Sequence, residues 1–370
     1  MKMHLRDVPK QIALSFAAGT NIGFVSQPGI GKTETISEAA RKLGERVPGF
    51  KMVEIDVPSM SPTDIGVYFP NMEARTLEFF ANGGLPNVYT DGEDAKGIAH
   101  MGELLNCDAA TGKLLQKWIN GEDINGKLRK PKGFIVVADS NRLSDKSHTQ
   151  QQSRALLSRI EWIEVYSDAE GNLQFMERNN FHPTIQAFAK EFPALIDNYS
   201  DVFETKGGSA EQSALQEEGK MGRWACMRGW KRLSDLETAA ESMGMELMPQ
   251  RAIANLGNGV GTQYNTFRMT VNQLATVEEI VKHPDTTPVP ERADMQYAQL
   301  VMLGMRVKNK DLSAAGKYMK RCAKDLQIAV VGRLITRDKR DPDLKLVSSP
   351  QFIEWMEDKD FHDLVQGAAR

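Results

Sequence analysis

The stretch that decides the fold is "SQPGIGKTE", residues 26–34, which has the composition of a phosphate-binding loop. The apolar run "NIGFVS" precedes it and reads as a buried strand, and the amphipathic segment 33–46 that follows reads as a helix. In such a loop, backbone N–H groups at a helix start bind phosphate oxygens, a lysine supplies charge, and a hydroxyl holds Mg²⁺. We predict nucleotide binding by Ser26, Gln27, Pro28, Gly29, Ile30, Gly31, Lys32, Thr33 and Glu34, with Thr33 as the Mg²⁺ ligand. Ser26 departs from the usual pattern, which has glycine there.

The segments on both sides of this loop predict an α/β fold. Apolar runs at 52–57, 134–139 and 161–166 read as further strands, and "KGIAHM" (96–101) is a weaker strand candidate. Amphipathic segments, including 107–119, lie between them. Strands that alternate with helices predict a parallel sheet with helices on both faces.

The pattern changes near residue 170, after which the segments read as helices. We predict an α/β nucleotide-binding domain at 1–170, a small helical lid domain at 171–285, and additional C-terminal helices at 286–370. Single helices are expected near 292–305, 311–331 and 350–366. The polar segment 204–223 reads as a mobile loop.

The composition excludes several classes of protein. A net charge of −3 over 370 residues gives no global signature of nucleic-acid binding. Neither a signal peptide nor an 18-residue apolar run is present, so we expect no membrane span. The three scattered cysteines, Cys107, Cys226 and Cys322, form no disulfide framework, which favours a reducing, cytoplasmic location.

"PGIGKTE", followed by "DVPSMSPTDIGVYFP" (56–70), resembles the MoxR branch of the AAA+ P-loop ATPases, and a viral or phage-like member fits this pattern. The resemblance extends over about residues 10–270. It implies a ring, mostly hexameric, that binds ATP and Mg²⁺ between subunits and remodels or loads a partner protein in a chaperone-like way. It also implies a separate partner chain, with the von Willebrand A type as the candidate.

The resemblance assigns a second motif to "IAHMGELLN" (98–106). Glu103 falls on the catalytic glutamate of the family, and Gly102 falls where the family has a magnesium-orienting aspartate. An alternative acid is Asp91, in "NVYTDGED". Because position 102 lacks a carboxylate, we expect slow hydrolysis or weak Mg²⁺ dependence unless another acid substitutes; the candidates are Asp56, Asp91 and Asp139.

Three further segments resemble motifs of the same family. "FIVVADSNR" (134–142) implies that Asn141 helps to place the attacking water. "QQSRALLSRIEWIEV" implies an arginine finger that reaches the neighbouring subunit, with Arg159 as the first candidate and Arg154 as the second. "CMRGWKRLSDL" (226–236) implies that Arg228 senses the γ-phosphate from the lid.

The segment 119–134 is a candidate substrate contact. Its glycines and proline predict a hairpin, and its second arm is basic through Lys127, Arg129, Lys130 and Lys132. The arm suits a nucleic acid or an acidic polypeptide, and a solvated loop fits equally well. The leading hypothesis is therefore a partner-remodelling ATPase. The alternatives are a DNA-associated motor or loader stimulated by nucleic acid, and an ATP-bound scaffold with negligible hydrolysis.

Overall fold

The computed structural model describes residues 2–142, 145, 153–199, 223–357 and 362. It contains two compact units, Met1–Gly171 and Asn172–Arg370, which we describe separately. In the part of the chain so described, no helix combines the length and apolar character that crossing a membrane would require. The predicted segment 204–223 lies, except for its last residue, outside the described residues.

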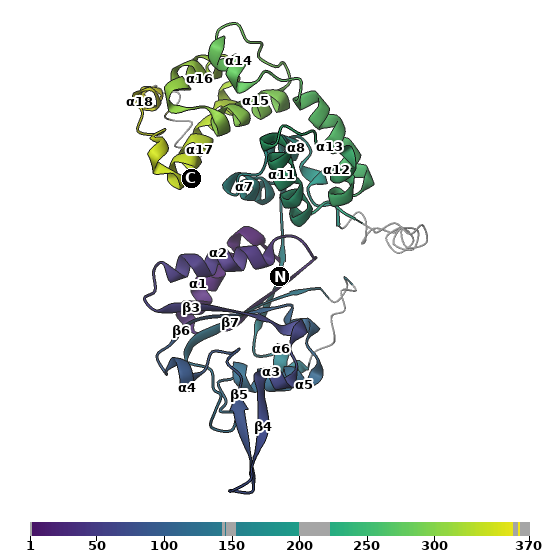
Figure 1. Cartoon of the computed structure of the whole chain (residues 1–370), viewed down its shortest axis with the longest axis vertical. Helices are drawn as coiled ribbons and strands as arrows, with labels where there is room; N and C mark the ends of the chain where they lie inside the picture. The colour runs from purple at the N-terminus through teal and green to yellow at the C-terminus, as the bar shows by residue number, and fades with distance from the viewer. Residues whose placement is uncertain (1, 143–144, 146–152, 200–222, 358–361, 363–370) are drawn as a thin grey trace. The chain divides into compact units, whose positions relative to one another are not determined.

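The first unit contains a six-stranded parallel sheet with the spatial order β1-β8-β2-β7-β6-β3 (Figure 1). After β2 the chain crosses to β3 at one edge, whereas after β7 it crosses in the opposite direction to β8. In parallel sheets, ligands bind at the carboxyl ends of strands where the connections diverge in this way. The strands are β1 (Lys2–His4), β2 (Ile22–Ser26), β3 (Phe50–Asp56), β6 (Lys96–Gly102), β7 (Gly133–Asn141) and β8 (Glu161–Tyr166).

Helices cover both faces of this sheet (Figure 1). Alternate residues of β7 point to opposite faces: Ile135 and Val137 pack with residues of α1 (Val8–Ala18) and α2 (Lys32–Gly44), and Val136 and Ala138 pack with residues of α3, α5 and α6. The parallel α/β fold predicted from the sequence is therefore confirmed. The remaining helices of this unit are α3 (Pro62–Ile65), α4 (Val88–Asp91), α5 (Ala109–Ile119) and α6 (Arg154–Leu157).

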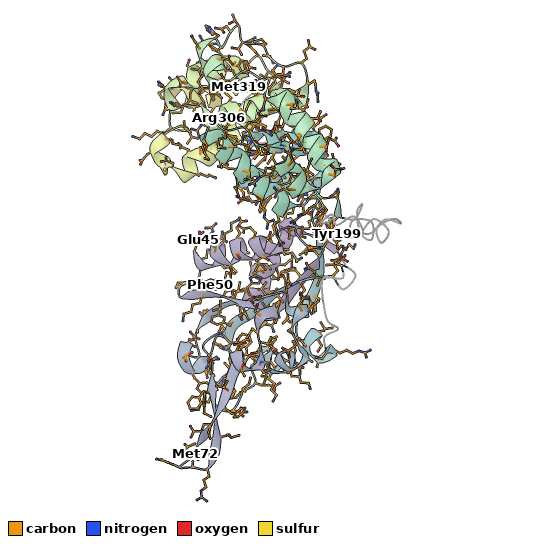
Figure 2. All side chains as sticks on the ribbon, turned by 45° about the vertical axis from the view of Figure 1, so that its right-hand side comes forward. Glu45, Phe50, Met72, Tyr199, Arg306 and Met319 are labelled. Carbon is orange, nitrogen blue, oxygen red and sulfur yellow. The ribbon has the colours of Figure 1, made fainter. Side chains whose placement is uncertain are left out.

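A two-stranded hairpin, β4 (Gly66–Asn71) and β5 (Thr76–Ala81), projects from this unit (Figure 1). Met72 lies near its far end and is 81% exposed (Figure 2). The hairpin predicted at 119–134 is instead a compact turn with one bridge, between Ile124 and Leu128, and no strand forms in residues 119–132. Residues of the predicted second arm have other partners: the Lys127 carbonyl accepts from Asn87, and Lys130 donates to the Phe134 carbonyl.

The second unit is helical. A single apolar core extends from Met176 to Trp355, so the segments 171–285 and 286–370 share it. Their separation into a lid and an extension stays a proposal. The helix predicted near 311–331 is two helices, because the 3₁₀-type bonds from Arg321 and Cys322 close the first. The helices are α7 (Ala169–Arg178), α8 (Pro183–Glu191), α11 (Met227–Ser242), α12 (Pro249–Leu256), α13 (Asn258–Val271), α14 (Val277–Lys282), α15 (Ala293–Arg306), α16 (Leu312–Met319), α17 (Lys324–Arg340) and α18 (Pro350–Glu357).

Candidate nucleotide-binding site

The predicted phosphate loop connects the carboxyl end of β2 to the start of α2. Gly29 and Gly31 have φ angles of 87° and 99°, a left-handed conformation that side-chain-bearing residues rarely adopt. Gly31 is also the N-cap of α2, so the free N–H groups of the first helical turn follow directly after the loop. The loop therefore has the backbone of an anion-binding site.

Lys32 lies at the centre of this loop and is only 8% exposed. Its Nζ donates to the Ser26 hydroxyl at 2.7 Å, to the Gln27 carbonyl at 3.2 Å and to Asn141 Oδ1 at 3.3 Å. These three acceptors are neutral oxygens, and they orient the ammonium group. The loop, the end of β2 and the end of β7 thus meet at one buried cation.

Ser26, the departure from glycine, is part of this arrangement. Its side chain is almost fully buried, and its hydroxyl donates to the Gln27 carbonyl at 2.7 Å while it accepts from Lys32. A hydroxyl can donate and accept at once, so serine supports the lysine where glycine would offer no side-chain oxygen. The substitution therefore leaves the loop intact.

Thr33, the predicted metal ligand, donates its hydroxyl to Asp139 Oδ2 at 2.9 Å. Asp139 is 3% exposed and comes from β7, the strand next to β2. Burial disfavours its charged form, but the neighbouring His100, the Glu103 N–H and the Thr33 hydroxyl outweigh burial and hold the pKa of the carboxyl below its ordinary value. An ionised carboxylate thus lies beside the threonine.

Glu103 directly follows β6 and has a left-handed backbone, with φ 49° and ψ 41°. This conformation is uncommon for a residue with a side chain and tends to occur at functional sites. Its N–H donates to Asp139 Oδ1 at 3.0 Å, and its exposed carboxylate accepts from Asn106 Nδ2 at 2.6 Å. The backbone of Glu103 is therefore fixed to the same carboxylate that contacts Thr33.

The alternative acids have other partners. Asp91 forms an ion pair with Lys51 at 2.9 Å, and Lys51 pairs with Gly97 near the amino ends of β3 and β6. The phosphate loop is at the carboxyl ends, so Asp91 is at the opposite end of the sheet. Asp56 ends β3, an edge strand, in register with Gly102, and its carboxylate accepts from the Ser59 hydroxyl.

The three predicted arginines lie on other elements than this cluster. Arg159, between α6 and β8, donates to the Ala155 carbonyl. Arg154 is exposed at the start of α6, and Arg228 is exposed in the first turn of α11, in the second unit. An arginine that reaches a neighbouring subunit, as predicted for Arg159 or Arg154, would be accessible in a single chain. These roles, and the sensing role of Arg228, remain predictions.

The basic arm retains less free charge than the sequence indicates. Lys130 Nζ donates to the Phe134 carbonyl at 2.6 Å, and burial lowers the pKa of Lys130. Arg129 pairs with Glu93. Lys127 and Lys132 remain exposed.

His100 is a member of the site that the sequence analysis missed. It is 3% exposed, and its Nε2 lies 3.8 Å from Asp139 Oδ2. The sequence did contain a signal for it, because His100 is a titratable residue within the otherwise apolar run Ile98–Met101.

The donor set fits Mg²⁺ rather than a metal held by protein alone. A hydroxyl and a carboxylate are the hard oxygen groups that Mg²⁺ accepts, and Mg²⁺ in nucleotide sites takes its other ligands from phosphates and water. Within the described residues, no group of three or more His, Cys, Asp or Glu side chains could hold a metal ion.

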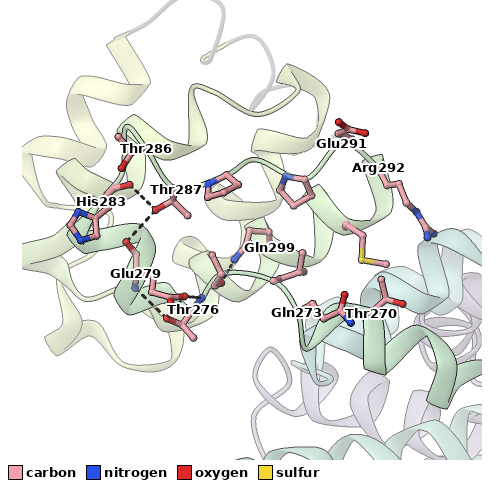
Figure 3. A pocket seen from close by; sticks show the side chains of 15 residues that line it. Thr270, Gln273, Thr276, Glu279, His283, Thr286, Thr287, Glu291, Arg292 and Gln299 are labelled. Atoms are coloured by element: carbon pink, nitrogen blue, oxygen red, sulfur yellow. Dashed lines mark hydrogen bonds between the residues drawn. The ribbon is translucent and has the colours of Figure 1, made fainter.

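A separate cavity of about 970 Å³ lies in the second unit (Figure 3). It is lined by residues between Thr270 and Gln299, including Leu274, Met295 and Arg292. None of the predicted site residues belongs to it, and most of its lining residues carry polar side chains, among them Thr276, Glu279 and Arg292. It offers no glycine-rich helix start of the kind found at Lys32.

Comparisons with known proteins give distant matches only. No protein-family model matches the chain, and no curated protein matches it either. Among solved structures, it is similar to a presumed ATPase from Cytophaga hutchinsonii, with 17% identity and a TM-score of 0.34 over 56% of this chain and 68% of that one. It is also similar to a mutant of RuvB from Thermotoga maritima, with 16% identity and a TM-score of 0.34 over 74% of this chain and 90% of that one. Values this low say nothing about activity, so the assignment of a site rests on the loop and the strand ends.

Proposed function

We propose that this chain is an AAA+ ATPase of the MoxR type, which binds ATP and Mg²⁺ between the subunits of a homo-oligomeric ring, most simply a hexamer. The observation that carries the proposal is the placement of Lys32. Its buried ammonium lies at the start of α2, in a loop formed by two left-handed glycines, between the ends of β2 and β7. These are the features that binding of nucleotide phosphates requires.

The other residues then take defined roles in the conversion of ATP and water to ADP and phosphate. Lys32 exchanges its bonds to Ser26 and Asn141 for bonds to phosphate oxygens, and Thr33 holds Mg²⁺. Bound Mg²⁺ neutralises charge on the phosphates during transfer. Glu103, with its exposed carboxylate, accepts the proton of the attacking water, and Asn141 orients that water.

Ring assembly completes the site in this proposal. Arg159, or Arg154 in its place, reaches the ATP of the neighbouring subunit, and Arg228 couples the γ-phosphate to the helical unit. Arg154 and Arg228 are exposed and Arg159 is partly exposed. A side chain that reaches the ATP of another subunit must be accessible in this way. Hydrolysis then depends on assembly, and each turnover is used to remodel or load a separate partner protein, with a von Willebrand A-type chain as the candidate, in the cytoplasm.

The test is phosphate release by the purified chain, alone and with DNA, together with its mass in solution with and without ATP. We expect slow release and a larger particle when ATP is present. Release that DNA stimulates in a salt-dependent manner would favour the DNA-associated motor. Tight ATP binding in a ring without release would favour the scaffold. A monomer that binds no ATP would overturn the proposal.

A further inference from the structure

We infer that Asp139 performs the magnesium-orienting role for which position 102 has no carboxylate, so that the acid has moved by one strand within the sheet. This inference rests on the proposed ATPase function and assigns one of its residues. It concerns Asp139 as a metal-positioning group, in partnership with Thr33.

The strand register places the two positions side by side. β6 and β7 are parallel, and the last pair in their register is Met101 with Ala138. The next residues along the two strands are Gly102 and Asp139. A Cβ atom added at Gly102 would have Asp139 Oδ1, at 3.8 Å, as its nearest neighbour. The carboxylate of Asp139 thus lies where a side chain at position 102 would point.

Asp139 also faces the correct side of the sheet. Residues 135 and 137 of β7 pack toward α1 and α2, and the alternation along a strand puts residue 139 on that same face. Its strand neighbour on the other side is Phe24 of β2, two residues before the phosphate loop. Asp139 therefore lies one strand closer to the loop than Gly102 does.

The contacts of Asp139 match the role. Oδ2 accepts from the hydroxyl of Thr33, the predicted metal ligand, and Oδ1 accepts from the N–H of Glu103, the predicted catalytic base. One carboxylate thus links the residue that would hold the metal to the residue that would activate water. Asp56 and Asp91 bond to Ser59 and Lys51 instead.

The experiment moves the carboxylate from position 139 on β7 to position 102 on β6. Five proteins are compared: the natural chain, Asp139→Asn, Gly102→Asp, the double variant Gly102→Asp/Asp139→Asn, and the control Asp56→Asn. A fluorescent ATP analogue is titrated into each, once in excess MgCl₂ and once in EDTA, and the ratio of the two affinities is the Mg²⁺-dependent gain. Mn²⁺ binding in the presence of ADP, followed by electron paramagnetic resonance, gives a second readout that needs no hydrolysis.

For Asp139→Asn we expect an affinity in EDTA close to that of the natural chain and a Mg²⁺-dependent gain reduced about tenfold or more. The double variant should recover part of that gain, because position 102 has room for a side chain and faces the same point. A purely structural role of Asp139 would lower the melting temperature and could not be rescued by an acid on β6. The matched control is Asp56→Asn, which should keep the full gain.

The outcomes separate this inference from the proposed function. ATP binding with a Mg²⁺-dependent gain that Asp139→Asn leaves unchanged would overturn the inference alone. Loss of the gain in Asp56→Asn, or a double variant that recovers none of it while remaining folded, would also overturn it. A natural chain that binds no nucleotide in either buffer would overturn both.

Discussion

Each unit contains a cluster of polar side chains, and the two clusters differ in their exposure to solvent. The sheet-end cluster consists of Lys32, Thr33, His100, Asp139 and Asn141. The helical cluster consists of Glu237, Tyr264 and Arg268. In the helical cluster, Tyr264 donates to Glu237 at 2.9 Å and Arg268 contacts the same oxygen at 3.1 Å.

The helical cluster is closed, whereas the sheet-end cluster opens to solvent. Tyr264 and Glu237 are buried, and burial, followed by the charge of Glu237, raises the pKa of Tyr264 well above its usual value. Thr33 and Glu103, by contrast, are exposed at the end of the sheet. A buried charge alone therefore does not indicate a functional site. A buried charge beside exposed polar groups, such as Thr33 and Glu103, is the stronger indication.

The largest expected effect tests whether the sheet-end cluster performs chemistry. Replacing Glu103 with Gln should slow phosphate release about 1,000-fold, because an amide cannot accept the proton of the attacking water. Binding of ATP should persist, as measured with a fluorescent analogue. Glu38→Gln, on the surface of α2, is the control and should hydrolyse normally. Unchanged turnover in Glu103→Gln would remove Glu103 from the catalytic role.

The helical cluster should respond only in stability. Glu237→Ala leaves Arg268 buried without its carboxylate, so the free energy of unfolding should fall by about 3 kcal/mol. Urea unfolding measures this change, and the ATP affinity of the folded protein should not move. The control is Asp235→Ala, which breaks an exposed pair with Lys231 on the same helix and should cost less than about 1 kcal/mol. Equal losses of unfolding free energy in the two variants would contradict a stabilising role of the Glu237 cluster beyond that of an exposed ion pair.

Lys32→Ala should weaken ATP binding about 100-fold, because charge-assisted bonds to phosphate are lost. Lys42→Ala is the matched control, since this lysine lies on the same helix but pairs with Glu38 at the surface. The measurement is equilibrium titration of the fluorescent analogue, with a thermal melt of each variant. If the two variants bind ATP equally well, the loop is not a phosphate site.

The smallest effect concerns acid stability in the helical unit. The pKa of Glu241 is lowered from 4.5 to about 2, first by His182, against the opposing effect of burial, and also by Arg306. A lowered carboxyl pKa contributes stability that is present above 4.5 and is lost as the pH falls toward 2. Because the side chain is 47% exposed, Glu241→Gln should cost less than about 1 kcal/mol at pH 6.

The same substitution should cost less still at pH 3, when urea unfolding is compared between the two proteins. A cost that increases on acidification would contradict the lowered pKa.

Local signals in the sequence predicted the loop, the parallel strands and the alternation of helices. Glycines with a lysine at a helix start have few other uses, and the apolar run of β7 is uninterrupted from Phe134 to Ala138. The partner of Thr33 was not predictable in the same way. Asp139 is 106 residues away from Thr33, and only the sheet order brings the two together.

The hairpin predicted at 119–134 does not form, for a related reason. Its Asn125 and Gly126 do adopt left-handed conformations, as a tight turn requires, but the flanking residues are held by other contacts. Lys130 bonds to Phe134, and Lys127 accepts from Asn87 through its carbonyl. Turn chemistry fixed the bend, whereas tertiary contacts decided against a ladder.

The register of β6 and β7 has a consequence for how such a chain can evolve. Positions 102 and 139 are neighbours across two strands, and an added Cβ at Gly102 meets nothing closer than 3.8 Å. A sequence with acids at both positions is therefore sterically permitted, and from it either acid can be lost. If Asp139 has the proposed role, a search that scores the motif on β6 alone misses the acid that β7 supplies.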